Sequence, residues 1–163
     1  MVSKRLSREA GHRRKFLSVV DNTPECERAI AYASWRARST GGAVVLLYVI
    51  DTADFQQWLG VEQIMREEAT ATARTALDGH AAHIRERAGI EPELIVREGS
   101  VTQEIHKLIE EDQDIAILVL AAGGAKEGPG PLVASIAGKG AAFPIPVTVV
   151  PAGLSDEEIE TMA

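Results

Sequence analysis

The sequence predicts an α/β fold: an open, mainly parallel five-stranded sheet with the strand order 3-2-1-4-5 and helices on both faces. Short apolar runs rich in β-branched residues alternate along the chain with longer segments whose apolar residues recur at helical spacing. The run Ala43–Ile50 is apolar without interruption, which is typical of a strand buried on both faces of a sheet. Strands that alternate with helices pair in parallel through right-handed crossovers, so the helices cover the sheet.

The first strand and the first helix are expected directly after a basic N-terminal segment. Phe16–Val20 is the apolar run of the strand, and Asp21–Pro24 has the composition of a turn. Thr23 is the expected N-cap of the helix and Pro24 its first residue, because a threonine oxygen can cap free N–H groups and the fixed φ of proline suits the first position. Gly41 and Gly42 end the helical spacing.

The second strand is Ala43–Ile50, and a long helix is expected after it at about Val61–Ala88, ended by Gly89. The loop between them carries Phe55 and Trp58, which are expected to be exposed. The inner face of the long helix is a stripe of apolar and small residues with one histidine. Its members are Met65, Ala69, Ala73, Ala76, Leu77, His80 and Ile84.

The second half of the chain continues the alternation. The third strand is expected at Glu93–Arg97 and the fourth at Ile115–Ala121. Between them, Ser100–Gln103 has the pattern of a capping box that begins a helix. The residues of that helix expected to point inward are Ile105, Leu108 and Ile109. A short helical pattern at Leu132–Ala142 precedes the fifth strand, Val147–Val150.

The composition is that of an ordinary globular protein with one domain. The chain has 163 residues, of which 45% are hydrophobic and 25% charged, enough for one substantial core. No apolar run approaches the roughly 18 residues of a membrane span, and residues 1–15 lack the apolar centre of a secretory signal. The single cysteine, Cys26, excludes an intrachain disulfide framework and fits a reducing compartment. We therefore expect a cytoplasmic protein with no membrane partner.

Charge divides the chain into three parts. Residues 1–15 hold six Lys or Arg residues and one Glu, a net charge of +5, and are expected to form a flexible basic arm. The whole chain carries −7, so the remainder carries −12, which argues against a nucleic-acid partner. Residues 16–152 are expected to form the α/β domain, and residues 153–163 a loose acidic tail.

A glycine-rich loop follows the fourth strand and is the strongest sign of a binding site. Ala121–Gly130 joins that strand to a helical pattern, an arrangement that can cradle phosphate, because glycine permits close approach and a helix N-terminus offers free N–H groups. In open α/β sheets, ligands bind beyond the carboxyl ends of the strands, where the strand order reverses. Asp21–Thr23 meets this loop only if the first and fourth strands are neighbours, as in the order 3-2-1-4-5.

Four short segments lie at the ends of predicted strands or form the last strand. Asp21–Thr23 follows the first strand, Leu47–Asp51 ends the second, Glu98–Ser100 precedes the third helix, and Pro144–Val150 forms the last strand. With these segments the chain resembles the universal stress protein family, an adenine-nucleotide-binding α/β fold, from Phe16 to Pro151. Nucleotide-binding members carry the motif G-x2-G-x9-G-[S/T] after the fourth strand.

The resemblance implies a set of nucleotide-binding residues. Asp21 would lie near the adenine and ribose, Val49 against the base, and Gly124 on the phosphates. Ser135 and Ile136 would donate hydrogen bonds to the phosphates from the start of a helix. The complete implied set is Asp21, Asn22, Thr23, Val49, Gly123, Gly124, Ser135 and Ile136. The implied ligand is ATP or another adenine nucleotide, and Mg²⁺ would enter only with the nucleotide.

The glycine motif is degenerate, which leaves two hypotheses open. Its first and third glycines are Ala121 and Ala134 here, whereas Gly124 and Ser135 remain. If both alanine positions need positive φ or backbone contact with phosphate, binding is weakened, and if their backbone is ordinary, a methyl group is tolerated. The chain is therefore either a nucleotide-binding regulatory module or a dimeric stress or interaction protein that keeps the fold without the ligand.

The remaining candidate residues favour structural roles. No catalytic residue or metal site is predicted, so at most slow ATP hydrolysis is expected. His80 and His83 share a helix without an evident third ligand, and we interpret them as histidines of a helix face. Cys26 has no paired histidine or second cysteine and is expected to be a small core residue.

The last strand is expected to form a homodimer. Its residues Val147, Thr148, Val149 and Val150 carry no charge, and the order 3-2-1-4-5 places them at a sheet edge, where unpaired backbone groups favour pairing. Prolines at both ends limit how far such pairing can extend. The resemblance implies the same partner, because universal stress proteins commonly dimerise through this strand. The open alternative is that a loop or the tail after Ser155 covers the edge.

Overall fold

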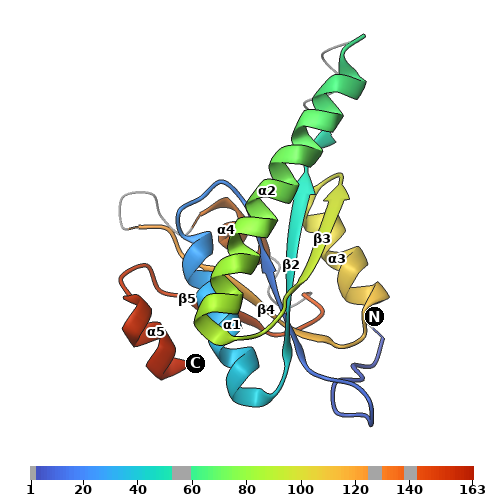
Figure 1. Cartoon of the computed structure of the whole chain (residues 1–163). Helices are drawn as coiled ribbons and strands as arrows, with labels where there is room; N and C mark the ends of the chain where they lie inside the picture. Colours follow the sequence, from blue (N-terminus) through green and yellow to red (C-terminus); the bar gives the residue numbers. More distant parts are fainter. Residues whose placement is uncertain (1–2, 53–59, 125–129, 138–142) are drawn as a thin grey trace.

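The computed structural model of the chain describes residues 3–52, 60–124, 130–137 and 143–163 (Figure 1). Strands and helices alternate from β1 to α5, and the sheet has the predicted order, β3-β2-β1-β4-β5. All four strand pairs are parallel. The strands are β1 (Lys15–Val19), β2 (Ala43–Ile50), β3 (Glu93–Glu98), β4 (Ile115–Ala121) and β5 (Val147–Val150).

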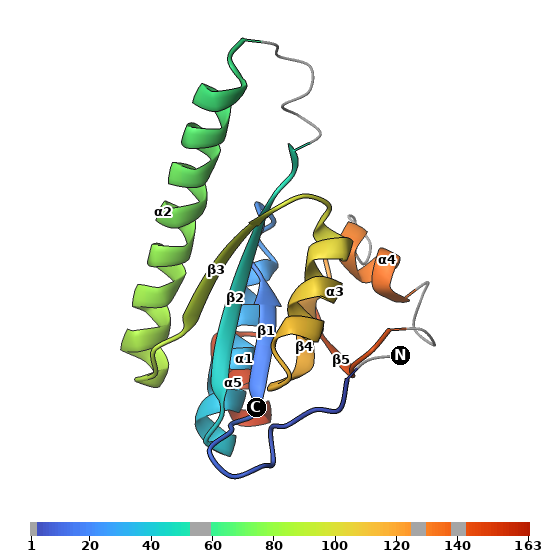
Figure 2. The ribbon, with the colours of Figure 1, turned by 90° about the vertical axis from the view of Figure 1, so that its right-hand side faces the viewer.

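Helices cover both faces of the sheet, as the alternating sequence pattern predicts. Figure 2 shows α1, α2 and α5 on one side of the strands and α3 and α4 on the other. The helices are α1 (Cys26–Thr40), α2 (Glu62–Ala88), α3 (Val101–Glu111), α4 (Pro131–Ala137) and α5 (Asp156–Met162). None of the described helices has the length and apolar composition that a bilayer crossing requires.

The alternation of side chains along β1 divides the core into two layers. Phe16 and Val20 belong to the layer beneath α1, α2 and α5, whereas Leu17 and Val19 belong to the layer beneath α3 and α4. Successive residues of a strand point to opposite faces, so a central strand needs apolar residues at almost every position. This requirement explains the uninterrupted apolar runs of the sequence.

The long helix α2 has the predicted inner face. Ala73, Leu77 and Ile84 are buried, and Ala81 and Ala88 extend the stripe. The other predicted members, Met65, Ala69, Ala76 and His80, are partly buried. The first turns of α2 extend beyond the carboxyl ends of the strands (Figures 1 and 2), so the apolar side chains there have less to cover them.

The start of α1 differs from the prediction. Its N-cap is Glu25, so Thr23 as N-cap and Pro24 as the first helical residue are wrong. The reason is that the Asp21 carboxylate accepts hydrogen bonds from both the N–H and the hydroxyl of Thr23. The threonine oxygen therefore serves a turn, and the helix begins at Cys26.

Two other helices, α3 and α4, differ from the prediction at one end. Ser100 is the N-cap of α3, as predicted, but its side chain makes no capping hydrogen bond, so the predicted capping box is not formed. The helix expected at Leu132–Ala142 is observed as Pro131–Ala137, and residues 138–142 lie outside the described residues. Phe55 and Trp58 also lie outside them.

The acidic tail is folded, so the expectation of a loose tail is wrong. Ser155 and Glu158 form a capping box that begins α5, and Ile159 is fully buried in the core layer that contains α1. Ile159 on a capped helix, together with the partly buried Leu154, supplies the apolar contact that the acidic composition conceals.

The basic arm makes defined contacts over residues 3–14. Arg5 donates hydrogen bonds to the carbonyl oxygens of Ile109 (2.6 Å), Asp112 (3.2 Å) and Ile115 (3.2 Å), where α3 ends and β4 begins. A guanidinium group suits this place because the last carbonyls of a helix lack partners and carry partial negative charge. The flexibility of the arm and the division of the chain at residues 15 and 152 stay predictions.

We expect Gly42→Ala to destabilise the fold by about 1–3 kcal/mol. A Cβ at Gly42 would lie 2.4 Å from the carbonyl oxygen of Arg14, which accepts the β2 hydrogen bond from the N–H of Ala43 at 2.9 Å. The matched control is Gly79→Ala in α2, where a Cβ meets nothing within 4 Å. It should stabilise by about 0.5–1 kcal/mol through helix propensity. Urea unfolding of both variants measures the difference, and equal stabilities would contradict the clash.

Candidate functional site

A cavity of about 410 Å³ opens beyond the carboxyl ends of β1 and β2, and we call it the strand-end cavity. This is the place where the order of strands reverses, because β1 lies between β2 and β4. The walls come from β1 and the turn after it, from β2, and from the starts of α3 and α4. The lining residues are Val19, Val20, Asp21, Asn22, Thr23, Tyr48, Val49, Val101, Thr102, Pro131, Leu132 and Ser135.

The lining has the chemistry of a small-molecule site. Aliphatic and polar side chains both line it, which is typical of pockets that bind a flat apolar ring with a polar attachment. The volume also lies within the usual range for such sites, roughly 300–1,000 Å³. Val101 and Thr102 are the first residues of α3, so the positive end of that helix dipole lies at the wall.

Asp21 is held in one orientation by its own turn. Its Oδ1 accepts a hydrogen bond of 2.9 Å from the N–H of Thr23 and a second one from the Thr23 hydroxyl. Within the described part of the chain, no hydrogen bond reaches the other carboxylate oxygen, Oδ2. The turn role of Asp21 and a role in binding therefore use different oxygens, and both can operate at once.

The cavity brings together five of the eight residues that the sequence nominates. Asp21, Asn22, Thr23, Val49 and Ser135 all line it. The sequence places Gly123 and Gly124 two and three residues after β4, and neither contributes to the cavity wall. Residues 125–129 of the glycine loop lie outside the described residues.

The start of α4 differs from the arrangement expected for phosphate donors. α4 begins at Pro131, and the N–H of Ala134 already donates to the carbonyl of Gly130 at 3.0 Å. Ser135 and Ile136 therefore lie inside the helix, where backbone N–H groups are bonded within it, and not at its start. Ile136 is 4% exposed and its side chain is core, whereas the Ser135 side chain remains at the cavity wall.

The two alanines of the degenerate motif occupy ordinary backbone. Ala121 is the last residue of β4 and Ala134 lies within α4, and no described residue other than glycine has positive φ. Neither alanine is conformationally strained, so the loss of glycine affects the site through the added methyl group alone. Ala122, the residue after Ala121, is fixed by two hydrogen bonds. Its N–H donates to the carbonyl oxygen of Val150 at 2.9 Å, and its own carbonyl oxygen accepts from Arg28 Nη2 at 3.0 Å.

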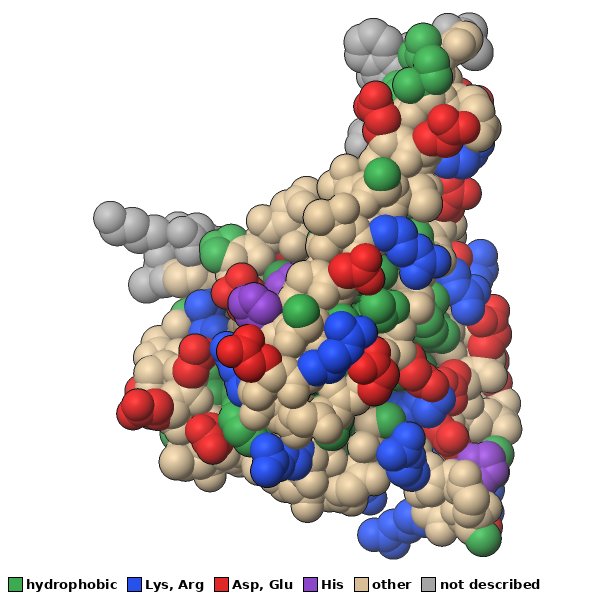
Figure 3. Space-filling view, in the orientation of Figure 1, with side chains coloured by type: hydrophobic (Ala, Val, Ile, Leu, Met, Phe, Trp, Pro, Cys, Tyr) green, Lys and Arg blue, Asp and Glu red, His purple; other side chains and the backbone are tan. Residues whose placement is uncertain are grey.

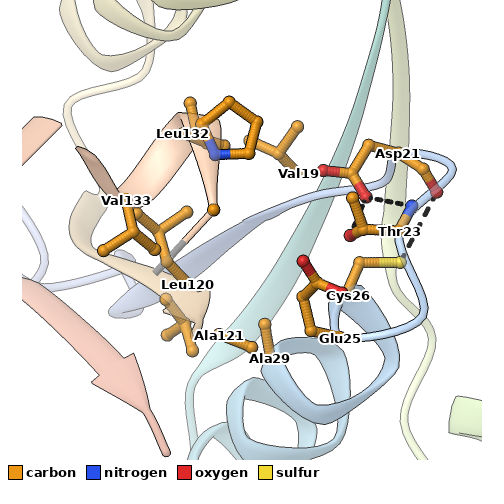
Figure 4. A pocket seen from close by; sticks show the side chains of 13 residues that line it. Val19, Asp21, Thr23, Glu25, Cys26, Ala29, Leu120, Ala121, Leu132 and Val133 are labelled. Atoms are coloured by element: carbon orange, nitrogen blue, oxygen red, sulfur yellow. Dashed lines mark hydrogen bonds between the residues drawn. The ribbon is translucent and has the colours of Figure 1, made fainter. Parts of the chain in front are cut away.

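A smaller cavity of about 30 Å³ lies beside the first, between the start of α1, the end of β4 and the start of α4 (Figure 4). Glu25, Cys26 and Ala121 line it together with Gly130. A Cβ built on Gly130 would lie 3.6 Å from Glu25 Oε1, so a carboxylate faces the end of the glycine loop. A negative charge at this point opposes a phosphate group that approaches the loop.

Cys26 is a core residue, as predicted. Its side chain is part of the layer beneath α1, and its thiol donates a weak hydrogen bond to the Asp21 carbonyl oxygen at 3.6 Å (Figure 4). Burial raises the pKa of the Cys26 thiol to about 11. The thiol is therefore protonated near neutral pH and is not an activated nucleophile.

Several wall residues were not predicted from the sequence. Tyr48, Val101, Thr102 and Leu132 line the cavity as well. The sequence contained a signal for Val101 and Thr102. The third strand ends just before them, so the first residues of α3 must lie at the carboxyl ends of the strands. Among the residues described, no group of three or more His, Cys, Asp or Glu side chains could hold a metal ion.

Comparisons with known proteins agree with this architecture. A model of the Universal stress protein family matches residues 12–151. A comparison with curated protein sequences gives no match. Among solved structures, universal stress protein UspA from Lactobacillus plantarum superposes with a TM-score of 0.70 at 17% identity, over 84% of this chain and 97% of that one.

Two other similar structures contain nucleotides. A universal stress protein in complex with cAMP has a TM-score of 0.60 at 12% identity, over 86% of this chain and 98% of that one. The universal stress protein from Archaeoglobus fulgidus in complex with dAMP has a TM-score of 0.54 at 18% identity, over 84% and 97%. At these identities the structures establish a common fold.

We expect Cys26 in the folded protein to react with iodoacetamide at pH 8 on the order of 100-fold more slowly than in the unfolded chain. A thiol pKa of about 11 leaves little thiolate at that pH, and the side chain is 7% exposed. The native rate should rise about tenfold per pH unit until the pH approaches the thiol pKa. Mass spectrometry of alkylated protein, with and without guanidinium, measures both rates. Equal rates in the two states would show that the thiol is accessible and ionised.

Proposed function

This chain belongs to the universal stress protein family, and we propose that it is a regulatory module that binds an adenine nucleotide in the strand-end cavity without rapid turnover. The observation that carries the proposal is the cavity itself, which lies beyond the carboxyl ends of β1 and β2 and combines aliphatic walls with the fixed carboxylate of Asp21. Relatives of the same fold in complex with cAMP and dAMP support the choice of an adenine nucleotide.

The proposed contacts follow from the wall chemistry. Val49 and the neighbouring aliphatic side chains would pack against the flat base, where apolar contact stabilises an aromatic ring. The Asp21 Oδ2 would accept hydrogen bonds from the adenine amino group or the ribose hydroxyls. Thr102, Ser135 and the start of α3 would contact the sugar and the first phosphate. Thr23 holds the turn that positions Asp21, and Asn22 lies within this turn at the cavity wall.

Slow turnover is proposed because of the charges that line the cavity. Its wall residues include one carboxylate and no Lys, Arg or His side chain among the residues described. Phosphoryl transfer depends on cations that stabilise negative charge in the transition state. Mg²⁺ would accompany a bound nucleotide and would be held mainly by its phosphates.

The carboxylates favour a nucleotide with few phosphates. Asp21 lines both cavities, and Glu25 faces the end of the glycine loop. Each added phosphate brings more negative charge toward these groups, and the whole chain carries −7. We therefore propose that AMP-like ligands bind at least as tightly as ATP.

The alternative function is an interaction protein that has kept the fold and lost the ligand. The methyl groups of Ala121 and Ala134 and the carboxylate of Glu25 favour it, because all three are unfavourable for a phosphate near the loop. Under this alternative, surfaces of the fold act directly on a protein partner. Nucleotide affinity separates the two functions.

A homodimer through β5 is the proposed assembly in both cases. β5 lies at the edge of the sheet, and Val149 is 43% exposed. The carbonyls of Pro146 and Val150 accept hydrogen bonds from Leu118 in β4 and from the residue directly after β4, so the carbonyls of the odd-numbered residues between them point to the open edge. α5 packs on the layer that contains α1, which supports an edge left open by the tail. Pairing of two copies across a two-fold axis would satisfy the unpaired groups.

We expect Asp21→Asn to weaken AMP and ATP binding at least about tenfold, or about 1.4 kcal/mol. The amide keeps an acceptor for the Thr23 turn and replaces the free Oδ2 acceptor with a donor, so it separates the binding role from the turn role. The matched control is Asp78→Asn on the exposed side of α2. Titration calorimetry provides the affinities.

Two results would argue against this nucleotide site. Equal affinities of wild type and Asp21→Asn would remove Asp21 from it. If wild type binds neither AMP nor ATP at millimolar concentration, the alternative function replaces the proposed one.

We expect Val149→Pro to convert the dimer into a folded monomer. Proline removes the Val149 N–H, which faces the open edge, and leaves the hydrogen bonds between β4 and β5 intact. Val149→Thr is the matched control, because it keeps the N–H and the branched side chain and should remain dimeric. Sedimentation velocity at tens of micromolar compares the three proteins. A monomeric wild type, or a proline variant that is folded and dimeric, would refute the proposed interface.

A further inference from the structure

A third cavity, of about 350 Å³, lies between α1, α2 and α5, on the face of the sheet away from α3 and α4. We call it the helix groove. Its lining residues are Pro24, Glu27, Arg28, Ile30, Ala31, Ser34, His80, His83, Ile84, Arg87, Leu154, Ser155 and Asp156. Figure 3 shows histidine side chains beside basic and acidic ones on this face. The groove is separate from the proposed nucleotide site, because the two cavities share no lining residue.

Arg28 brings an uncompensated positive charge to the groove. Within the described part of the chain, no carboxylate lies within ion-pair distance of its guanidinium group. Its Nη2 donates to the Ala122 carbonyl at 3.0 Å, and its Nε is buried with no acceptor among the same residues. A half-buried guanidinium group with neither counter-ion nor full hydrogen bonding is costly unless a further acceptor is present.

Arg87 adds a second, weakly paired cation. Its Nη2 lies 3.7 Å from Asp156 Oδ2, and the Asp156 side chain is 72% exposed, so water competes with this ion pair. The other acid of the groove, Glu27, is also exposed and forms no described ion pair with Arg28. Both acids are therefore solvated, while Arg28 is drawn into the protein.

Two histidines complete the polar wall. His80 is half-buried on the inner side of α2, and His83 is exposed one turn further along. Imidazole groups can donate to an oxyanion in the neutral state and bind it more strongly when protonated. The walls thus hold two permanent cations and two groups that can become cations.

We propose that the helix groove binds a small oxyanion, the phosphate or carboxylate group of a metabolite, between Arg28, Arg87 and the two histidines. Guanidinium groups bind phosphate and carboxylate through paired N–H donors, and a half-buried setting strengthens such contacts. Leu154, Ile84 and Ala31 would contact the apolar part of the metabolite. The groove volume exceeds that of a bare phosphate ion, which is why the proposed ligand carries such a part.

Binding should become stronger as the pH falls. Burial lowers the pKa of His80, as does the neighbouring His83, while Glu27 opposes the shift. A bound oxyanion favours the protonated imidazole, so it must raise the pKa of His80, and affinity must rise as the pH decreases through the His80 pKa. The other charged or titratable groups that line the groove with His80 are Glu27 and Arg28 on α1, His83 and Arg87 on α2, and Asp156 at the start of α5.

The test is an NMR titration of the full chain with inorganic phosphate, and separately with succinate, at pH 6 and pH 7.5. The reporters are the histidine ring resonances, because His80 and His83 line the groove and His12 lies outside it. We expect saturable shifts of His80 and His83 with at least one of the two anions, and a raised His80 pKa at saturation. Preference for phosphate or for succinate identifies which oxyanion the groove accepts.

Matched variants make the result specific. Arg87→Gln should weaken the titrated affinity at least fivefold, whereas Arg74→Gln, on the same helix but outside the groove, should not. Arg28→Gln should weaken it further, and if loss of the Ala122 contact unfolds that variant, Arg87→Gln and His83→Gln still decide. Shifts of His80 and His83 that merely follow those of His12, or affinities unchanged by Arg87→Gln, would overturn the proposal.

Discussion

The position of β1 between β2 and β4 is the constraint on which the rest of this structure depends. β1 pairs in parallel with both neighbours, and the chain leaves β1 toward α1 on one face of the sheet but leaves β4 toward α4 on the other. The segments that follow β1 and β4 therefore diverge at the same edge of the sheet, and a crevice forms there. The Asp21 turn, the strand-end cavity and the glycine loop all belong to that edge.

Electrostatics distinguishes this chain from a simple phosphate cradle. Carboxylates, Asp21 and Glu25, face the end of the sheet where a phosphate would approach, and the described wall of the strand-end cavity offers no basic side chain. Basic side chains gather instead in the helix groove. Arg28 connects the two regions, because its guanidinium group holds the Ala122 carbonyl at the start of the glycine loop and also lines the groove. A ligand in the groove would therefore act on a residue that supports the loop.

The fold was predictable because its signals are local and repeated. Ala43–Ile50 must be apolar on both faces, and Ala73, Leu77 and Ile84 must recur at helical spacing, so each element carries many consistent residues. Errors occurred where one residue decides the structure. Thr23 could cap a helix or complete an Asp21 turn, and Ile159 is the one fully buried residue of an otherwise acidic tail among the residues described. Such choices depend on competing contacts that a periodic pattern does not contain.

By itself the sequence determined the order of elements and most residues of the core, because hydrophobic periodicity specifies which faces are buried. Its motifs resembled those of a known family, and that resemblance agreed with the strand order that is observed. It also nominated Asp21, Val49 and Ser135, which the structure places around one cavity. Only the tertiary structure decided that Ala121 and Ala134 have ordinary backbone, that Glu25 faces the glycine loop, and that three helices enclose a groove. These features depend on the distances between side chains far apart in the chain, and those distances are set by how the helices pack on the twisted sheet.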